Sequence, residues 1–168
     1  EGWNIIGYVR TEAADAADMM SPIVDDMVIM KDENGSVYWP AFGLNNIGNM
    51  MADEGYQVKM DAGAMFSYPS GSGRLAYVEP IRTIHYEVAP NTGSNMTIGL
   101  PTTAWEVMPA IGDEIAAYDE SGRLIGSTSF NGENIALTVW GDDLTTDTKD
   151  GLAIGEQVTF KLWNSDMN

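Results

Sequence analysis

The chain has 168 residues, of which 44% are hydrophobic, enough to bury one large core or two small ones and to argue against disorder. Its 25 acidic and 8 basic residues give a formal net charge of −17, which opposes binding to nucleic acids and to anionic membranes. The absence of cysteine excludes disulfides, thiol catalysis and zinc–thiolate sites. No stretch approaches the roughly 20 apolar residues that cross a bilayer, so no membrane insertion is expected.

Residues 1–66 are predicted to form a first β unit with one short helix. Apolar residues alternate loosely over residues 2–9, which predicts an opening strand. A short helix is expected near residues 11–20, where alanine and methionine dominate, with Thr11 as its N-cap. A hairpin over residues 27–39 follows, with an acidic turn between its strands.

Residues 67–94 are predicted to connect two units through strands and a loop. Glycine, serine and proline concentrate over residues 67–73, as in an exposed loop or a hinge between half-domains. Strands are predicted over residues 74–78 and 81–88, and the second contains His85, the single histidine. A lone histidine in a strand is usually structural, and no Gly-x-Ser-x-Gly elbow accompanies it.

Residues 95–168 are predicted to form a second β unit with an acidic insertion at residues 141–151. A helical turn is expected over residues 102–107. Strands are expected over residues 95–100, 115–118, 124–130, 135–140 and 157–163. Because no helix is long enough for a parallel crossover, the predicted fold class is mostly β, an antiparallel β-sandwich built from two related half-units with one or two short helices.

The two units contain the same hairpin pattern at a constant spacing. Residues 26–38 and 113–125 each consist of an apolar run, a four-residue acidic turn and a second apolar run. The offset is 87, since 113 − 26 = 87 and 122 − 35 = 87. Near the end of each unit Lys59 matches Lys161, so the offset becomes 161 − 59 = 102 and the second unit has gained 102 − 87 = 15 residues. This pattern indicates a duplicated unit.

Several runs in both halves carry a resemblance to a known group of proteins. They are residues 2–6, 28–40, 42–45, 47–48 and 54–58 in the first half, and 112–115, 119–122, 137–143, 149–151 and 160–163 in the second. In these runs the chain resembles an uncharacterised β-rich module of secreted and surface proteins of Bacteroidota, which are multidomain proteins associated with type IX secretion. The resemblance implies an extracellular or cell-surface location and supplies no catalytic residues.

The acidic insertion is the candidate metal site. Asp142, Asp143, Asp147 and Asp150 fall within nine residues of a loop bounded by glycines. Calcium takes about six to eight oxygen ligands, and such a loop can supply several of them. The spacing does not match an EF-hand, and the alternative is a solvated acidic loop held by Asx-turns and caps. Calcium is therefore a candidate ligand, and no other cofactor is predicted.

Tyr38 and Trp39 are the candidate ligand-binding residues. They are adjacent in a predicted strand, so one of them must point outward unless both faces are covered. An exposed flat ring can stack on a sugar or anchor a protein contact, and the alternative is that both rings fill the core. Acidic neighbours such as Asp113 and Glu114 are poor candidates for a glycosidase pair, because adjacent strand residues point to opposite faces.

These observations predict a non-catalytic extracellular structural or adhesion module of a secreted or cell-surface bacterial protein, and not an enzyme. The first alternative is a carbohydrate-binding module that uses exposed aromatic residues and is stabilised by calcium. The second is a subunit of an extracellular or phage-like assembly. The expected partners are a glycan or protein surface ligand, neighbouring domains or like subunits, and no nucleic acid.

Overall fold

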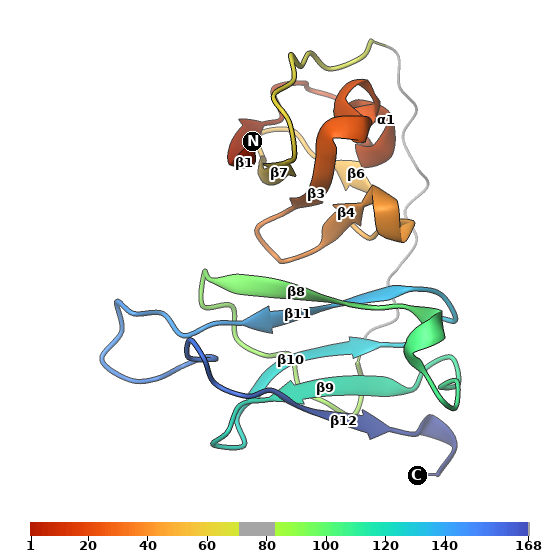
Figure 1. The fold of residues 1–168 in the computed structure, drawn as a ribbon, viewed down its shortest axis with the longest axis vertical. Coiled ribbons are helices and arrows are strands. Elements are labelled where there is room, and N and C mark those ends of the chain that lie inside the picture. Colours follow the sequence, from red (N-terminus) through yellow and green to blue (C-terminus); the bar gives the residue numbers. More distant parts are fainter. Residues whose placement is uncertain (71–82, 168) are drawn as a thin grey trace. The chain divides into compact units, whose positions relative to one another are not determined.

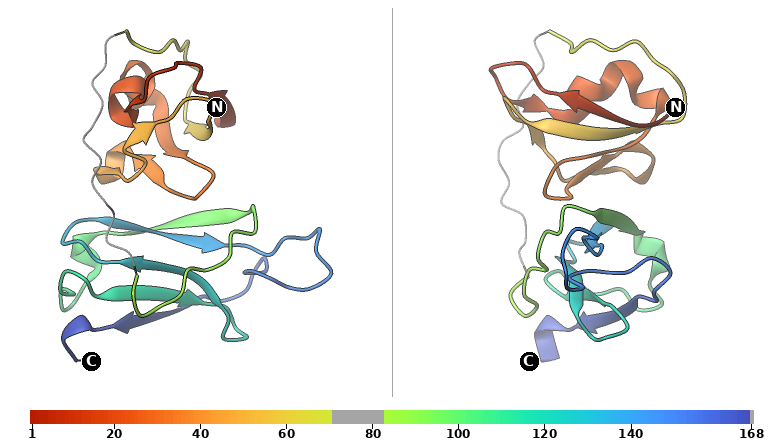
Figure 2. Two further views of the ribbon diagram at one scale, coloured as in Figure 1. Left: turned by 180° about the vertical axis from the view of Figure 1, so that it is seen from behind. Right: turned by 90° about the vertical axis from the view of Figure 1, so that its left-hand side faces the viewer.

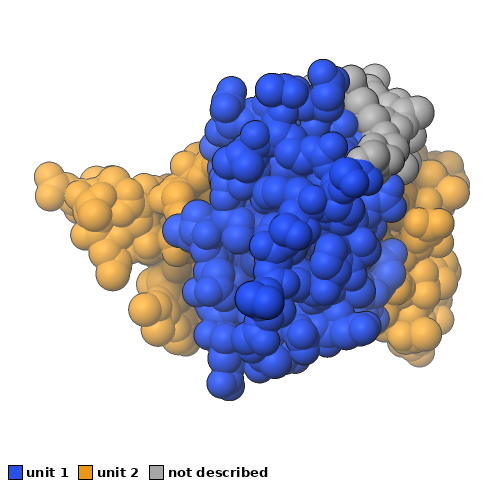
Figure 3. Space-filling view, turned by 90° about the horizontal axis from the view of Figure 1, so that it is seen from above, with its two compact units in different colours: residues 1–79 blue, residues 80–168 orange. Residues whose placement is uncertain are grey.

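The structure is a computed structural model that describes residues 1–70 and 83–167. The chain divides into two compact units, residues 1–79 and residues 80–168, which Figure 3 shows in different colours. Their boundary lies inside the segment 67–94 that was expected to connect two units. Both units are built from antiparallel sheets with one short α-helix in the first, and the predicted mostly β fold class is confirmed (Figure 1).

Unit 1 contains a five-stranded sheet with the order β1-β7-β3-β4-β5, and two further short strands, β2 and β6, pair with each other. The strands are β1 (Gly2–Gly7), β2 (Ala14–Asp15), β3 (Met27–Lys31), β4 (Val37–Trp39), β5 (Leu44–Asn45), β6 (Asn49–Met50) and β7 (Gly55–Met60). The residues of β7 are alternately exposed and buried, with Tyr56, Val58 and Met60 in the core. This is the pattern of a strand that has one face on a core and one in solvent.

The short helix α1 (Ala16–Met20) continues into the 3-10 segment η1 (Ser21–Asp26). A helix is present in the expected region, but Thr11 is not its N-cap. The carboxylate of Asp15 accepts the backbone N–H of Asp18 at 2.9 Å and caps the helix instead. Because β2 pairs with β6, its backbone stays extended, so the helix begins only at Ala16.

The core of unit 1 is rich in methionine. Six methionines are buried there: Met19, Met20, Met27, Met30, Met50 and Met60. Their flexible thioether side chains fill irregular gaps between the sheet, α1 and η1. Phe66 and Tyr68, which follow β7, also pack against this core. Much of the methionine content of the chain is therefore explained by packing.

Unit 2 contains a three-stranded sheet with the order β10-β9-β12 and a two-stranded sheet with the order β11-β8 (Figures 1 and 2). The strands are β8 (Asn95–Leu100), β9 (Glu114–Tyr118), β10 (Leu124–Ser129), β11 (Ile135–Trp140) and β12 (Thr159–Trp163). The expected helical turn after β8 is the 3-10 segment η3 (Thr102–Ala104). The core of this unit is built from aliphatic and aromatic side chains, among them Ile115, Phe130 and Leu137.

The repeat seen in the sequence is reproduced in strand boundaries and in register. The strand β3 begins at Met27 and β9 at Glu114, and 114 − 27 = 87. In unit 1 Lys31 of β3 lies opposite Gln57 of β7, and in unit 2 Tyr118 of β9 lies opposite Thr159 of β12. These pairs differ by 118 − 31 = 87 and 159 − 57 = 102, the two offsets found in the sequence. The hairpins are therefore equivalent, and β12 corresponds to β7.

The turns of the two hairpins share one hydrogen-bond pattern. In unit 1 the carboxylate of Asp32 accepts the backbone N–H of Ser36 at 2.8 Å, and in unit 2 that of Asp119 accepts the backbone N–H of Arg123 at 2.8 Å. Gly35 and Gly122, three residues after these aspartates, both have φ = +83°, a conformation that other residues rarely adopt. The acidic turn is thus an Asx-type turn in both units.

The connecting segment differs from the prediction. The strand expected over residues 74–78 lies outside the described residues. The strand expected over residues 81–88 is wrong for its described part, because residues 84–86 form a bend and pair with no strand. Their amides bind a buried side chain instead, as described below.

We expect Gly126→Ala to destabilise unit 2. The backbones of β10 and β11 approach so closely there that a Cβ atom on Gly126 would lie 2.2 Å from the carbonyl oxygen of Thr138. The substitution should lower the free energy of unfolding by about 2 kcal/mol, the usual cost of overpacking. Urea denaturation measures it, with Gly7→Ala as the control because no atom lies within 4 Å of that position. Equal changes in the two variants would contradict the expectation.

Candidate functional site

The acidic loop between residues 141 and 151 is closed by hydrogen bonds to its own backbone. A parallel bridge between Gly141 and Leu152 holds its two ends. The carboxylate of Asp142 accepts the N–H of Asp150 at 2.8 Å, and the carboxylate of Asp150 accepts the N–H of Asp143 at 2.9 Å. These reciprocal bonds hold the two ends of the loop together.

The structure does not bring the four predicted metal ligands together. Over residues 1–70 and 83–167, no three carboxylate or histidine side chains lie in an arrangement that could hold a metal ion. Asp147 is exposed in the loop. Asp143 accepts the backbone N–H and the hydroxyl of Thr145, at 2.9 and 2.8 Å, and these bonds lower the pKa of its carboxyl group. The geometry matches the alternative of Asx-turns and caps.

We therefore expect calcium and chelators to leave thermal stability unchanged. A ligand present at 100 times its dissociation constant stabilises a folded protein by about 2.7 kcal/mol, which would raise the melting temperature by several degrees. For this chain, the melting temperatures in excess EDTA and in excess calcium chloride should agree within experimental error, because no site is filled. A calcium-dependent rise that Asp143→Ala abolishes would restore the metal hypothesis.

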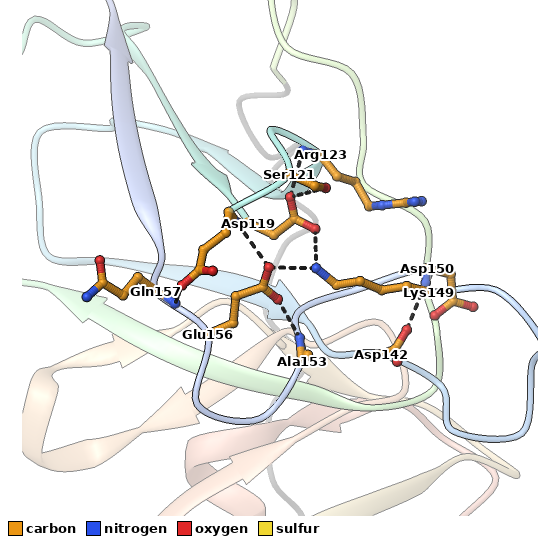
Figure 4. A network of polar contacts seen from close by, with 10 residues as sticks. Asp119, Ser121, Arg123, Asp142, Lys149, Asp150, Ala153, Glu156 and Gln157 are labelled. Carbon is orange, nitrogen blue, oxygen red and sulfur yellow. Dashed lines mark hydrogen bonds and ion pairs between the residues drawn. The ribbon is translucent and has the colours of Figure 1, made fainter.

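Lys149 joins this loop to the repeated turn of unit 2 (Figure 4). Its Nζ lies 2.8 Å from Oδ2 of Asp119 and 2.6 Å from Oε1 of Glu156. The side chain of Asp119 is fully buried, whereas 34% of the Lys149 side chain is exposed. The other carboxylate oxygen of Glu156 accepts the N–H of Ala153 at 2.9 Å. The insertion that distinguishes unit 2 from unit 1 thus supplies the cation for a buried carboxylate.

In the two repeated turns the pKa of the equivalent aspartate is shifted in opposite directions. Burial alone would raise the pKa of Asp119, but hydrogen bonds from Lys149, Ser121 and Arg123 outweigh it and lower the pKa to about 2. The same pairing raises the pKa of Lys149. Burial raises the pKa of Asp32, the counterpart in unit 1, although hydrogen bonds within its turn oppose the change. The two aspartates therefore respond to acid in opposite directions.

Of the two predicted ligand-binding residues, one lies in the core and one faces outward. Tyr38 is 9% exposed and packs in the core of unit 1, where burial raises the pKa of its hydroxyl. Trp39 is half-buried and stacks on Phe42, with ring centroids 4.9 Å apart and planes inclined by 24°. Only Trp39 remains a candidate for a binding surface.

Trp39 shares its side of the five-stranded sheet with Trp3. On β1, Trp3 lies opposite Lys59 of β7, and Lys59 lies opposite Ile29 of β3. Side chains of alternate residues share a face, so these residues and Trp39 of β4 lie on one side of the sheet, which we call the outer face of unit 1. Trp3 is 52% exposed, and Nζ of Lys31 lies 5.5 Å from its ring centroid.

Glu114 organises a site that the sequence does not predict. It is buried at 1% exposure, and its carboxylate accepts the consecutive backbone N–H groups of Ile84, His85 and Tyr86. The distances are 3.0 Å from His85 to Oε1 and 2.9 Å from Tyr86 to Oε2. Consecutive amides that converge in this way form a cradle for an anion. The one signal in the sequence is the offset of 87, which pairs Glu114 with Met27.

Aromatic rings extend the contact between this segment and the sheet. The ring of His85 stacks on Trp163 of β12, with centroids 4.7 Å apart and an interplanar angle of 6°. Tyr86 contacts Tyr118 of β9 edge-on at 6.4 Å. The single histidine is therefore held in a structural role, on the side of β9 and β12 where Glu114 also lies.

No protein-family model, curated protein or solved structure matches the chain. Among the described residues, no helix has both the length and the apolar character to span a membrane. The fold and its polar clusters define a two-unit, mostly β protein in which one hairpin occurs twice. Three of the four aspartates predicted as metal ligands, Asp142, Asp143 and Asp150, accept backbone N–H groups of their own loop.

Proposed function

We propose that the chain is a non-catalytic structural or adhesion module of a secreted or cell-surface bacterial protein. The observation that carries the proposal is the repetition of one hairpin, with the same turn and the same residue pair next to it, in two units that each have their own core. Repetition of a β unit supplies length and repeated surfaces, which are the properties that spacing and adhesion require. The resemblance of the sequence to surface modules of Bacteroidota supports the location.

The polar groups of the described residues support a structural role. The buried carboxylates of Glu114 and Asp119 are occupied by backbone amides or by Lys149. The acidic loop, which carries the densest group of carboxylates, is bound to its own backbone. Groups held in this way stabilise a fold, and a charge of −17 keeps a protein soluble at high local concentration.

The location is tested with antibodies raised against the purified chain. We expect them to label intact cells of the source organism, or to detect the chain in the culture medium. Labelling that appears only after the cells are permeabilised would overturn the proposal. An antibody against a cytoplasmic protein, applied to the same cells, reports whether the envelope is intact.

A carbohydrate-binding function is the second candidate, and the outer face of unit 1 favours it. Trp3 and Trp39 lie on this face with Lys59 between them in the strand order, and flat aromatic rings stack on sugars. Native gels that contain soluble polysaccharides should retard the protein, and Trp3→Ala and Trp39→Ala should each weaken the effect. Tyr38→Phe is the control, because it leaves a buried ring in place. If no polysaccharide retards the protein, this candidate is discarded.

A further inference from the structure

The edge of β12 differs from the equivalent edge in unit 1. In unit 1, β7 pairs with β3 on one side and with β1 on the other, where six residue pairs run from Gly2–Met60 to Gly7–Gly55. In unit 2, β12 pairs with β9 in the matching register. Within residues 83–167 and 1–70, no strand pairs with its other side, and Figure 1 shows β12 at the end of its sheet. In the described part of unit 2, no strand fills the position that β1 fills in unit 1.

Glu114 binds residues 84–86, and this contact explains why no strand pairs with the second side of β12. The offset of 87 places the counterpart of β1 at residues 89–94, since 2 + 87 = 89 and 7 + 87 = 94, and this stretch forms no strand. The chain just before it is held over β9 by the three amide bonds to Glu114. Unit 1 has Met27 at the equivalent position, which offers no acceptor for such amides, and its incoming chain pairs with β7.

Two apolar side chains of β12 are more exposed than their counterparts in unit 1, which lie in its core. Phe160 and Leu162 are 47% and 48% exposed. Their counterparts at the offset of 102, Val58 and Met60, are 2% and 8% exposed. Phe160 and Leu162 also line an apolar pocket of about 260 Å³, whose other lining residues are Leu100, Ala104, Trp105, Ile115 and Lys161. The edge therefore adjoins a cavity of a size that side chains of an added strand can enter.

Trp105, one of the residues that line this pocket, has an unsatisfied donor. The indole Nε1–H of Trp105 is buried and, among the described residues, donates to no acceptor. A buried donor without a partner costs about 1–3 kcal/mol, so such groups are rare in folded proteins. The state of this donor is an observation independent of the comparison between the units.

We propose that β12 accepts a β-strand from another protein, an uncharged extended segment of about six residues with apolar side chains at alternate positions. The model for this segment is β1, which fills the equivalent place and has the uncharged sequence Gly-Trp-Asn-Ile-Ile-Gly. The charge of −17 disfavours an acidic partner, including a second copy of the chain. Acceptance of a strand goes beyond the proposed function, because neither spacing nor adhesion requires it.

The test uses the complete chain and a capped synthetic peptide with the sequence of residues 2–8. Nuclear magnetic resonance of the isotope-labelled protein should show shifts for the amides of Thr159–Trp163 and for the indole N–H of Trp105. Phe160→Glu should abolish binding, and Leu144→Glu is the matched control because Leu144 is an 83% exposed apolar residue outside the edge. A peptide with proline in place of its first isoleucine loses a strand hydrogen bond and should not bind.

Three results would overturn the proposal: no binding at millimolar peptide, shifts that map to β7 in place of β12, or binding that Phe160→Glu leaves intact. Self-association of the free chain through β12, detected by sedimentation and removed by Phe160→Glu, would also overturn it, since the occupant would then be a second copy. The location experiment described above uses a different readout, so failure of the proposed function is distinguishable from failure of this inference.

Discussion

Replacing Glu114 by glutamine is expected to lower the free energy of unfolding of unit 2 by about 3 kcal/mol, the order found when hydrogen bonds to a buried charged group are lost. The carboxylate of Glu114 accepts the N–H groups of Ile84, His85 and Tyr86. The amide of glutamine has one acceptor oxygen in place of two. Its NH₂ group would face the backbone N–H groups, and both are hydrogen-bond donors. Residues 84–86 should detach from β9, and the ring of His85 should no longer stack on Trp163.

Two measurements separate this effect from general destabilisation. Urea denaturation gives the loss in stability, and hydrogen exchange at residues 84–86 reports whether the segment detaches under native conditions. Glu87→Gln is the matched control, because it makes the same change on an exposed residue of the same segment. The expectation fails if the exchange of these amides is the same in Glu114→Gln and in Glu87→Gln.

Unit 2 is expected to unfold in acid before unit 1. The pKa of Asp119, about 2, lies below that of an unfolded aspartate, about 4, so the unfolded chain binds the proton more tightly. Its stabilising contribution is complete above about pH 4 and is lost as the pH falls towards 2. Hydrogen bonds from Ser165 and Ala110 outweigh burial and also lower the pKa of Asp113, which adds to the effect.

Asp32 acts in the opposite direction in unit 1. Burial raises its pKa, so ionisation is less favourable in the folded unit than in the unfolded chain. Its contribution to stability therefore increases as the pH falls through the folded pKa and on to the unfolded value. Protonation of Asp32 favours folding of unit 1 as the pH falls to about 4, whereas protonation of Asp119 disfavours folding of unit 2 as the pH falls from about 4 towards 2.

Pepsin, which is active in acid, measures the order of unfolding directly. Between about pH 4 and 2, the range over which the contribution of Asp119 is lost, cleavage should begin within residues 95–163 while residues 1–60 stay intact. The variant Asp119→Asn should be less stable near neutral pH and should lose less stability on acidification. First cleavage in unit 1, or an unchanged profile for Asp119→Asn, would contradict the expectation.

Local patterns in the sequence were sufficient to predict the hairpins and their relationship. Apolar runs on either side of an Asp-x-x-Gly turn specify both strands, because the side chain of Asp32 or Asp119 and the glycine three residues later set the turn by themselves. The change of offset from 87 to 102 also predicts the register of β12 on β9, since each strand keeps its apolar residues on the core side. The fold class follows from these local features.

Features that depend on contacts between distant residues were missed or misjudged. Residues 84–86 alternate like a strand, yet their amides bind Glu114, which lies about thirty residues further along the chain. The aspartates of the acidic loop lie close together in the sequence, which left open both a calcium site and a loop held by Asx-turns, and Asp142, Asp143 and Asp150 bond to backbone amides of the same loop. Alternation alone could not decide which of Tyr38 and Trp39 faces the core. Each of these outcomes depends on which residues contact one another in the folded chain.

Because the interior of unit 1 is rich in methionine, the resistance of this unit to oxidants depends on how often the unit opens. Methionine is readily oxidised to methionine sulfoxide, and the sulfoxide is too polar for a packed interior. Met19, Met20, Met30 and Met50 have no exposed surface, so peroxide reaches them only when the unit opens. Each oxidised side chain then hinders closure. Oxidative ageing should therefore accumulate in unit 1 and spare the interior of unit 2, where aliphatic and aromatic side chains offer no sulfur.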